Sequence, residues 1–126
     1  MGQLPVKLFL AVAAGGAIGA TARYAAVLIW PETFGRFPWT TFAINVIGSF
    51  ALGIIIAMVG HSVMARTFLG VGVLGGFTTF STFAWQGEQL LSEERPGIAI
   101  GYLAGSVVCG LFAAWLGLRT GGWLRD

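Results

Sequence analysis

The run Gly75-Gly76-Phe77-Thr78-Thr79-Phe80-Ser81-Thr82-Phe83 decides the fold, because it lies inside a long apolar stretch but has the wrong composition for an ordinary membrane helix. Two adjacent glycines, three threonines and a serine weaken a helix at these nine positions. Such residues are tolerated at membrane depth only where protein or a water-filled cavity covers the backbone. The run therefore predicts a break in a membrane helix beside a polar site.

The composition places the whole chain in a membrane. Of 126 residues, 56% are hydrophobic and 10% charged, with a mean hydropathy of +0.83, whereas soluble domains carry about 25% charged residues. Each apolar stretch provides the ~20 helical residues that a bilayer requires. We expect an all-α membrane protein with one domain over residues 1–126 and four spans, at about 4–30, 39–59, 66–91 (broken near 75–79) and 97–118.

An even number of spans places both chain ends on one side of the membrane, but the charges orient the chain only weakly. Four basic residues fall on the side of the termini and two on the other: Lys7, Arg66, Arg119 and Arg125 against Arg36 and Arg95. Two topologies stay open under the positive-inside rule. The chain has a single orientation with cytoplasmic termini, or it inserts both ways and forms an antiparallel dimer.

Several classes of function are disfavoured. The single histidine, His61, and the single cysteine, Cys109, form no nucleophile–base pair or metal-ligand cluster, so we do not expect an enzyme. A net charge of +2 is too small to indicate nucleic-acid binding. A proton-coupled exporter of the small multidrug type needs a carboxylate inside the membrane, and the acids fall in loops, near span ends or in the tail. A non-transporting assembly subunit stays open, although it would not require the broken helix.

Polar residues within the spans indicate where an ion could pass. Arg23 either extends to the interface or provides a fixed positive charge that draws anions to a vestibule or anchors a re-entrant backbone. Asn45 makes hydrogen bonds between helices or donates to an anion. The two polar rows, each spaced for one helix face, are Thr41, Asn45, Ser49 and Tyr102, Ser106, Gly110. The second row is a short track of hydroxyl donors.

The broken segment offers sites for two kinds of ion. Backbone carbonyls that a break releases could coordinate a small cation. Beyond the break, Phe80 and Phe83 share one helix face. The edge of an aromatic ring is positive, so two rings turned edge-on could hold a small anion without a countercharge. Alternatively, both phenylalanines pack in the core or face lipid.

Three motifs resemble the Fluc (CrcB) family of microbial fluoride channels over nearly the whole chain. Residues 16–24 resemble its first-span pattern G-x-x-G-A-x-x-R-Y, and residues 41–50 its second-span pattern T-x-x-x-N-x-x-G-S-F. Residues 72–83 are similar to its broken third span, which is its most specific part. The chain departs from the family at Gln86, where an acid is usual, and at Gly110, where some members have serine.

The resemblance implies a fluoride-selective channel that exports fluoride passively across the bacterial inner membrane. It implies an antiparallel, dual-topology homodimer in membrane lipid, with two pathways at the subunit interface. The pathway residues that it implies are Phe80 and Phe83 (the "Phe box"), Asn45, Tyr102, Ser106, Ser81 and Thr82. It further implies a vestibule role for Arg23, and a structural sodium ion at the dimer centre held by the main-chain carbonyls of Gly75 and Thr78.

Overall fold

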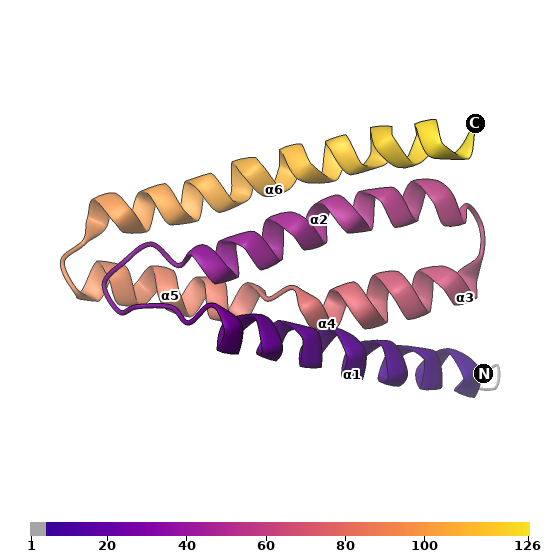
Figure 1. The fold of residues 1–126 in the computed structure, drawn as a ribbon, viewed down its shortest axis with the longest axis horizontal. Coiled ribbons are helices and arrows are strands. Elements are labelled where there is room, and N and C mark those ends of the chain that lie inside the picture. Colours follow the sequence, from indigo (N-terminus) through magenta and orange to yellow (C-terminus); the bar gives the residue numbers. More distant parts are fainter. Residues whose placement is uncertain (1–4) are drawn as a thin grey trace.

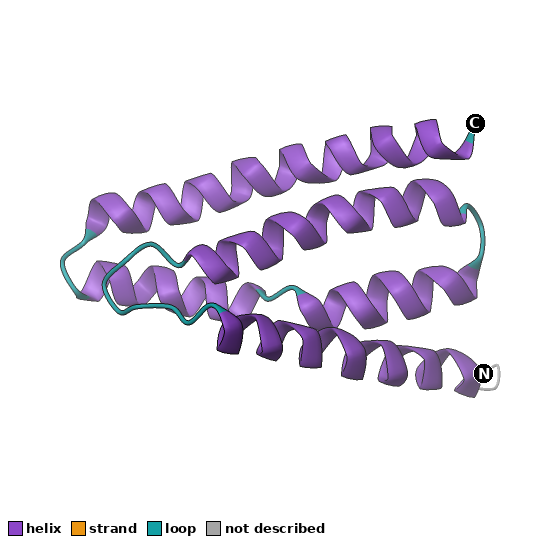
Figure 2. Cartoon of the chain, in the orientation of Figure 1, coloured by secondary structure: helices purple, strands orange, loops and turns teal. Residues whose placement is uncertain are grey.

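The computed structural model describes residues 5–126 and consists of helices and short connections (Figures 1 and 2). The elements are α1 (Val6–Ile29), α2 (Trp39–Val59), α3 (Val63–Ala65), the π-helix η1 (Arg66–Leu74), α4 (Gly75–Phe77), α5 (Phe80–Ser92) and α6 (Pro96–Arg125). There is no strand within the described range. Leu4, the predicted start of the first span, lies outside it.

Four helical segments are long and apolar enough to cross a membrane, which confirms the predicted number of spans. They are α1, α2, the composite third span from Val63 to Ser92, and α6. The spans run side by side, and the start of α1 lies at the same end of the bundle as the end of α6 (Figure 1). Within the bundle, α2 packs along α6, while α1 packs along η1 and α4. The protein is therefore a multi-pass membrane protein.

The third span breaks at two residues. The two glycines of the predicted break remain helical, with φ −63° and ψ −37° at Gly75, and α4 continues to Phe77. Thr78 (φ −80°, ψ 159°) and Thr79 (φ −148°, ψ 118°) are extended, and the helix resumes at Phe80. The break expected near 75–79 is thus confined to the threonine pair.

Threonine hydroxyls explain why the chain leaves the helix at this point. The Thr78 hydroxyl donates to the Leu74 carbonyl at 2.8 Å, and the Thr78 N–H donates to the same oxygen at 2.9 Å. The Thr79 hydroxyl accepts the Thr82 N–H at 3.2 Å and so caps α5. A threonine N-cap satisfies an amide that has no partner within its own helix. The two threonines end one half of the span and begin the next.

Glycines let α1 approach the third span until their backbones touch. A Cβ on Gly15 would lie 2.9 Å from Gly72 Cα, and one on Gly76 would lie 2.7 Å from the Gly16 carbonyl oxygen. A Cβ on Gly19 would overlap the Val73 carbonyl. Small residues at such spacing commonly allow close helix packing in membranes. The contact holds η1 and α4, which precede the break, directly against α1.

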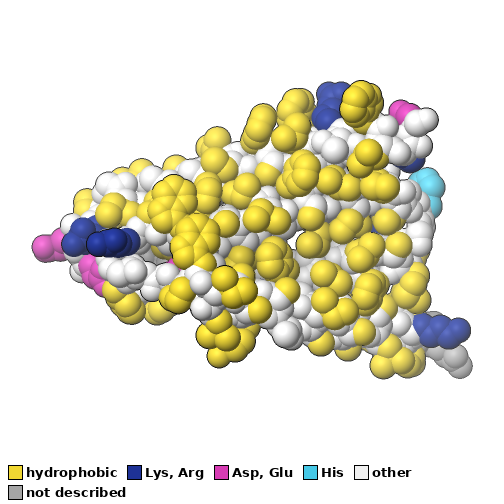
Figure 3. All heavy atoms as spheres, in the orientation of Figure 1, with side chains coloured by type: hydrophobic (Ala, Val, Ile, Leu, Met, Phe, Trp, Pro, Cys, Tyr) yellow, Lys and Arg dark blue, Asp and Glu magenta, His cyan; other side chains and the backbone are white. Residues whose placement is uncertain are grey.

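The flanks of the bundle are apolar and its ends are charged (Figure 3). Large side chains such as Leu10, Ile29 and Val108 are exposed along the flanks. A soluble protein would bury most such side chains, but in a bilayer they contact lipid or another copy. The buried core is correspondingly small, and it centres on Leu90, Ala99 and Tyr102.

The contact of Gly19 with the third span provides a test of the fold. We expect Gly19→Val to lower the free energy of unfolding by about 1–3 kcal/mol, the usual cost of overpacking, because its side chain meets the Val73 backbone. Thermal unfolding of the purified protein in detergent measures the change. Gly16→Ala is the matched control on the same helix, since its Cβ meets nothing within 4 Å. Equal melting temperatures for Gly19→Val and the control would contradict the packing described.

Candidate functional site

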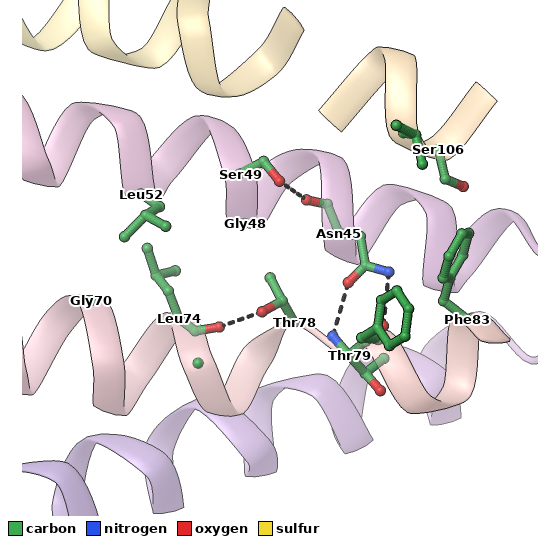
Figure 4. Close-up of a pocket in the computed structure, with 13 residues that line it drawn as sticks. Asn45, Gly48, Ser49, Leu52, Gly70, Leu74, Thr78, Thr79, Phe83 and Ser106 are labelled. Atoms are coloured by element: carbon green, nitrogen blue, oxygen red, sulfur yellow. Dashed lines mark hydrogen bonds between the residues drawn. The ribbon is translucent and has the colours of Figure 1, made fainter. Parts of the chain in front are cut away.

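A pocket of about 350 Å³ lies beside the break, between α2, the third span and α6 (Figure 4). Asn45, Ser49, Phe80, Phe83 and Ser106 contribute to its wall. The remaining lining residues are Gly48, Leu52, Gly70, Leu74, Gly75, Thr78, Thr79 and Val107. The pocket therefore combines two aromatic rings with hydroxyl and amide groups and exposed backbone.

Asn45 binds the backbone of the break with both ends of its amide. Its Oδ1 accepts the Thr79 N–H at 2.9 Å, and its Nδ2 donates to the Thr79 carbonyl at 3.1 Å (Figure 4). The Ser49 hydroxyl donates to the main-chain carbonyl of Asn45 at 2.7 Å. The Asn45 oxygen replaces the Gly75 carbonyl that the Thr79 N–H would have as its partner in a continuous helix, and the amide nitrogen adds a bond to the N-cap carbonyl of α5. Asn45 thus makes the interhelical bonds that were one of its two expected roles, and it keeps one amide N–H for the pocket.

Arg23 holds the break from the opposite side. Its Nε donates to the Gly76 carbonyl at 3.1 Å, from α1 to the third span. Arg23 is half-buried and does not line the pocket. This contact corresponds to the expected role in which Arg23 anchors irregular backbone. A charged donor is well suited to a carbonyl that faces the interior of the bundle.

The break separates several carbonyls from their helical partners, and those of Gly75 and Thr78 are among them. In a continuous helix, the Gly75 carbonyl would accept from the Thr79 N–H, and the Thr78 carbonyl from the Thr82 N–H. Here the Thr79 N–H donates to Asn45 and the Thr82 N–H donates to the Thr79 hydroxyl. Gly75 is also exposed on the surface of the protein. The chemistry of both oxygens fits the ligands of a small hard cation.

The two phenylalanines lie just beyond the break, with ring centroids 5.6 Å apart and planes inclined at 52°. The Phe80 side chain is 78% exposed, whereas Phe83 is half-buried. The Phe83 ring also meets the Tyr102 ring at 5.3 Å and 62°, in an edge-to-face arrangement. The Phe83 ring is therefore held by the core, while the Phe80 ring projects from the protein surface.

The two hydroxyls of the expected donor track have different surroundings. Ser106 Oγ is buried in the pocket wall and has no hydrogen-bond partner among the described residues. The Tyr102 side chain is fully buried, and its hydroxyl donates to Gln86 Oε1 at 2.7 Å. Tyr102 does not line the pocket. Ser106 is thus the free donor of the two.

The other predicted donors lie outside the pocket. Ser81 is exposed, and its hydroxyl lies 3.5 Å from the Thr79 hydroxyl. Thr82 follows on the same turn of α5, and neither residue is part of the pocket wall. The pocket thus brings together Asn45, Phe80, Phe83, Ser106, Gly75 and Thr78. Arg23, Tyr102, Ser81 and Thr82 surround this group.

One further residue, Glu32, has no local signal in the sequence. It lies in the α1–α2 loop, but its side chain turns inward and receives the Thr41 N–H at 2.7 Å and the Thr41 hydroxyl at 3.2 Å. It also receives a hydrogen bond from Gln86 Nε2. Nine residues separate Glu32 from Thr41, so no helical spacing connects them. The glutamine at position 86 was the one indirect signal, because a buried amide requires polar partners.

The fold and the pocket together define a class: a four-helix membrane protein whose third helix is interrupted at a polar, aromatic-lined pocket. The sequence profile of the family described as CrcB-like protein, Camphor Resistance (CrcB), matches residues 10–118. The chain belongs to this family.

Curated relatives cover most of the chain. It is 46% identical to the "Fluoride-specific ion channel FluC 2" of Streptomyces avermitilis over 84% of this chain and 68% of the relative. It is 42% identical to a "Fluoride-specific ion channel FluC" of Thermus thermophilus, over 93% of this chain and 97% of the relative. A channel of the same name from Novosphingobium aromaticivorans is 46% identical over 85% and 90% of the two chains.

The amide of Asn45 provides a test of the site. We expect Asn45→Ala to lower the free energy of unfolding by about 1–3 kcal/mol, because it leaves the Thr79 N–H unpaired. Hydrogen exchange of the Thr79 amide should become faster. Ser49→Ala is the control, since it removes a hydroxyl that bonds its own helix. An unchanged Thr79 exchange rate in Asn45→Ala would show that the amide does not hold the break.

Proposed function

We propose that this protein is a fluoride-selective channel that exports fluoride passively. The observation that carries the proposal is the pocket beside the break, where Phe80, Phe83 and the unpartnered Ser106 hydroxyl meet. The names of the family relatives support the same ion. An inside-negative potential drives an anion outward by ~2.3 kcal/mol per 100 mV. The function therefore requires a pathway rather than an energy source or a catalytic centre.

The pocket offers a small anion several weak donors instead of a formal positive charge. Ring edges carry partial positive charge, and the Ser106 hydroxyl and the second N–H of the Asn45 amide supply hydrogen bonds. Fluoride is small and holds its water tightly, so each displaced water needs a donor in its place. Ser81 and Thr82 are candidate donors for the pathway beside the pocket, and Tyr102, whose hydroxyl donates to Gln86, contributes its ring behind Phe83.

The proton-coupled exporter is not favoured. Such a mechanism needs a carboxylate within the membrane. Of the described acids, Glu88 is the one within a helix, and it lies exposed about one turn before the end of α5, where the Ser92 hydroxyl donates to it at 2.5 Å. None of these described acidic side chains lines the pocket.

We also propose that two antiparallel copies form the channel. Phe80 and Gly75 are exposed on the face that carries the break, where a second subunit would cover them. The bias of basic residues between the two ends is weak, four against two, and it permits insertion in both orientations. Each copy brings its own pocket, so the dimer would have two pathways.

We further propose that a sodium ion binds at the centre of this dimer, on the face that carries the break. The Gly75 and Thr78 carbonyls lack their helical partners, and a two-fold axis near the break would bring four such oxygens together. A sodium ion bound there would supply positive charge to the break and join the subunits. Arg23 supports this geometry through its bond to the Gly76 carbonyl.

Fluoride efflux from liposomes that contain only this protein tests the channel. We expect efflux well above that of empty vesicles, with chloride retained. Efflux no faster than from empty vesicles would overturn the function.

We expect Phe80→Ile and Phe83→Ile each to reduce efflux by at least about 100-fold, roughly 2.7 kcal/mol at RT ln 100, because aliphatic groups lack the positive ring edge. The dimer should remain folded, as measured by size-exclusion chromatography. Phe9→Ile is the matched control, since Phe9 is exposed on α1 away from the pocket. Normal efflux through both pocket variants would remove the phenylalanines from the pathway.

Sodium should be needed for activity. We expect protein purified and reconstituted in N-methylglucamine salts to lose fluoride efflux, because four carbonyl oxygens would face each other without a cation. Return of sodium before reconstitution should restore the efflux. Full activity after thorough removal of sodium, checked by flame photometry, would contradict the site while leaving the channel proposal intact.

A further inference from the structure

A chain of hydrogen bonds runs from the α1–α2 loop to the core of the bundle. The Gln86 amide lies at its centre, with Nε2 donating to Glu32 Oε2 and Oε1 accepting the Tyr102 hydroxyl. Thr41 donates to both oxygens of Glu32 from the first turn of α2. The chain thus joins the loop, α2, α5 and α6. It is buried from Thr41 (2% exposed) through Gln86 (8%) to Tyr102 (0%).

The chemistry of the chain allows one direction of donation. A carboxylate accepts hydrogen bonds and donates none, so Glu32 requires the NH₂ group of the Gln86 amide to face it. The amide oxygen then faces Tyr102, and the Tyr102 hydroxyl must donate its one proton to that oxygen. The charge on a loop residue therefore determines how a hydroxyl in the core is oriented.

The orientation matters because Tyr102 supports the Phe83 ring. The two rings meet edge to face at 5.3 Å, and Phe83 lines the pocket while Tyr102 does not. A Tyr102 hydroxyl that is held by Gln86 keeps its ring in place and does not present its proton to an ion in the pocket. If the direction of these hydrogen bonds were reversed, the Tyr102 proton would no longer be bound to Gln86.

We propose that Glu32 is a positioning residue that acts through Gln86: its carboxylate holds the Tyr102 hydroxyl as a donor to Gln86 and the Tyr102 ring against Phe83. The consequence for transport rests on the proposed function, whereas the direction of hydrogen-bond donation from Tyr102 to Glu32 does not. The hydrogen bond from Gln86 to Glu32 is charge-assisted and therefore stronger than a hydrogen bond between two neutral groups. Loss of the charge weakens the chain at its outer end.

Two substitutions with nearly the same shape separate charge from packing. In Glu32→Gln, the Thr41 N–H still requires an oxygen, so the new NH₂ group faces Gln86. The Gln86 amide must then turn over and donate to Tyr102, whose hydroxyl becomes an acceptor. In the double variant Glu32→Gln/Gln86→Glu, the carboxylate at position 86 accepts from both neighbours. The Tyr102 hydroxyl donates again, as in the native protein.

Tyrosine Raman spectroscopy reads the direction directly. The intensity ratio of the tyrosine Fermi doublet is low when the phenol donates a hydrogen bond and high when it accepts one. All samples are full-length protein in vesicles with Tyr24→Phe, which leaves Tyr102 as the only tyrosine. We expect a low ratio in this background, a high ratio in Glu32→Gln, and a low ratio again in the double variant. Glu88→Gln is the control, because it removes a carboxylate whose one hydrogen-bond partner in the described part of the chain is Ser92, and its ratio should stay low.

The same vesicles report the effect on transport. We expect fluoride efflux to fall roughly 5-fold in Glu32→Gln, which corresponds to about 1 kcal/mol or one ordinary hydrogen bond, and to recover in the double variant. An unchanged Raman ratio in Glu32→Gln, or a double variant that stays like the single one, would overturn the positioning role. If the ratios change as expected but the background protein releases no fluoride, the positioning role stands and the proposed channel function fails.

Discussion

The pairing of the Asn45 amide with the Thr79 backbone is the interaction on which the rest of the site depends. A break inside a membrane leaves backbone N–H and carbonyl groups without partners, and each costs several kcal/mol in an apolar environment. Asn45 provides both a donor and an acceptor at 3.1 and 2.9 Å. Without this amide, a continuous helix would be the more stable form of the third span, and the pocket would be lost.

Contacts from both sides of the third span reinforce this pairing. The close approach at Gly15 and Gly76 brings α1 against α4, which lets Arg23 reach the Gly76 carbonyl. The break is therefore held between α1 and α2. The helix after it begins where the Thr79 hydroxyl caps α5, and so the positions of Phe80 and Phe83 follow from the same two residues. The hydrogen bonds of Asn45 and Thr79 therefore determine both the backbone at the break and the positions of the two phenylalanine rings.

Sequence reasoning identified the spans and the broken segment because both depend on composition. It placed Asn45 at the site but left its role open, since helical spacing does not say what lies opposite a side chain. It located the break at 75–79, whereas the structure keeps Gly75 and Gly76 helical and bends at the threonines, whose hydroxyls take over the backbone bonds. It assigned Glu32 to a loop. A loop conformation depends on contacts with distant residues, here Thr41 and Gln86.

The sequence by itself determined that the protein crosses the membrane four times and that the third span is interrupted, because hydrophobic length and helix-weakening residues act locally. It also placed Phe80 and Phe83 on one face, which follows from helical periodicity. Only the tertiary structure decided which polar groups meet. The Ser106 hydroxyl has no partner among residues 5–126, the Tyr102 hydroxyl donates to Gln86, and the Glu32 side chain turns inward. The physical reason is that each of these hydrogen bonds joins residues from different segments, and only the packing of the helices brings those segments within about 3 Å of one another.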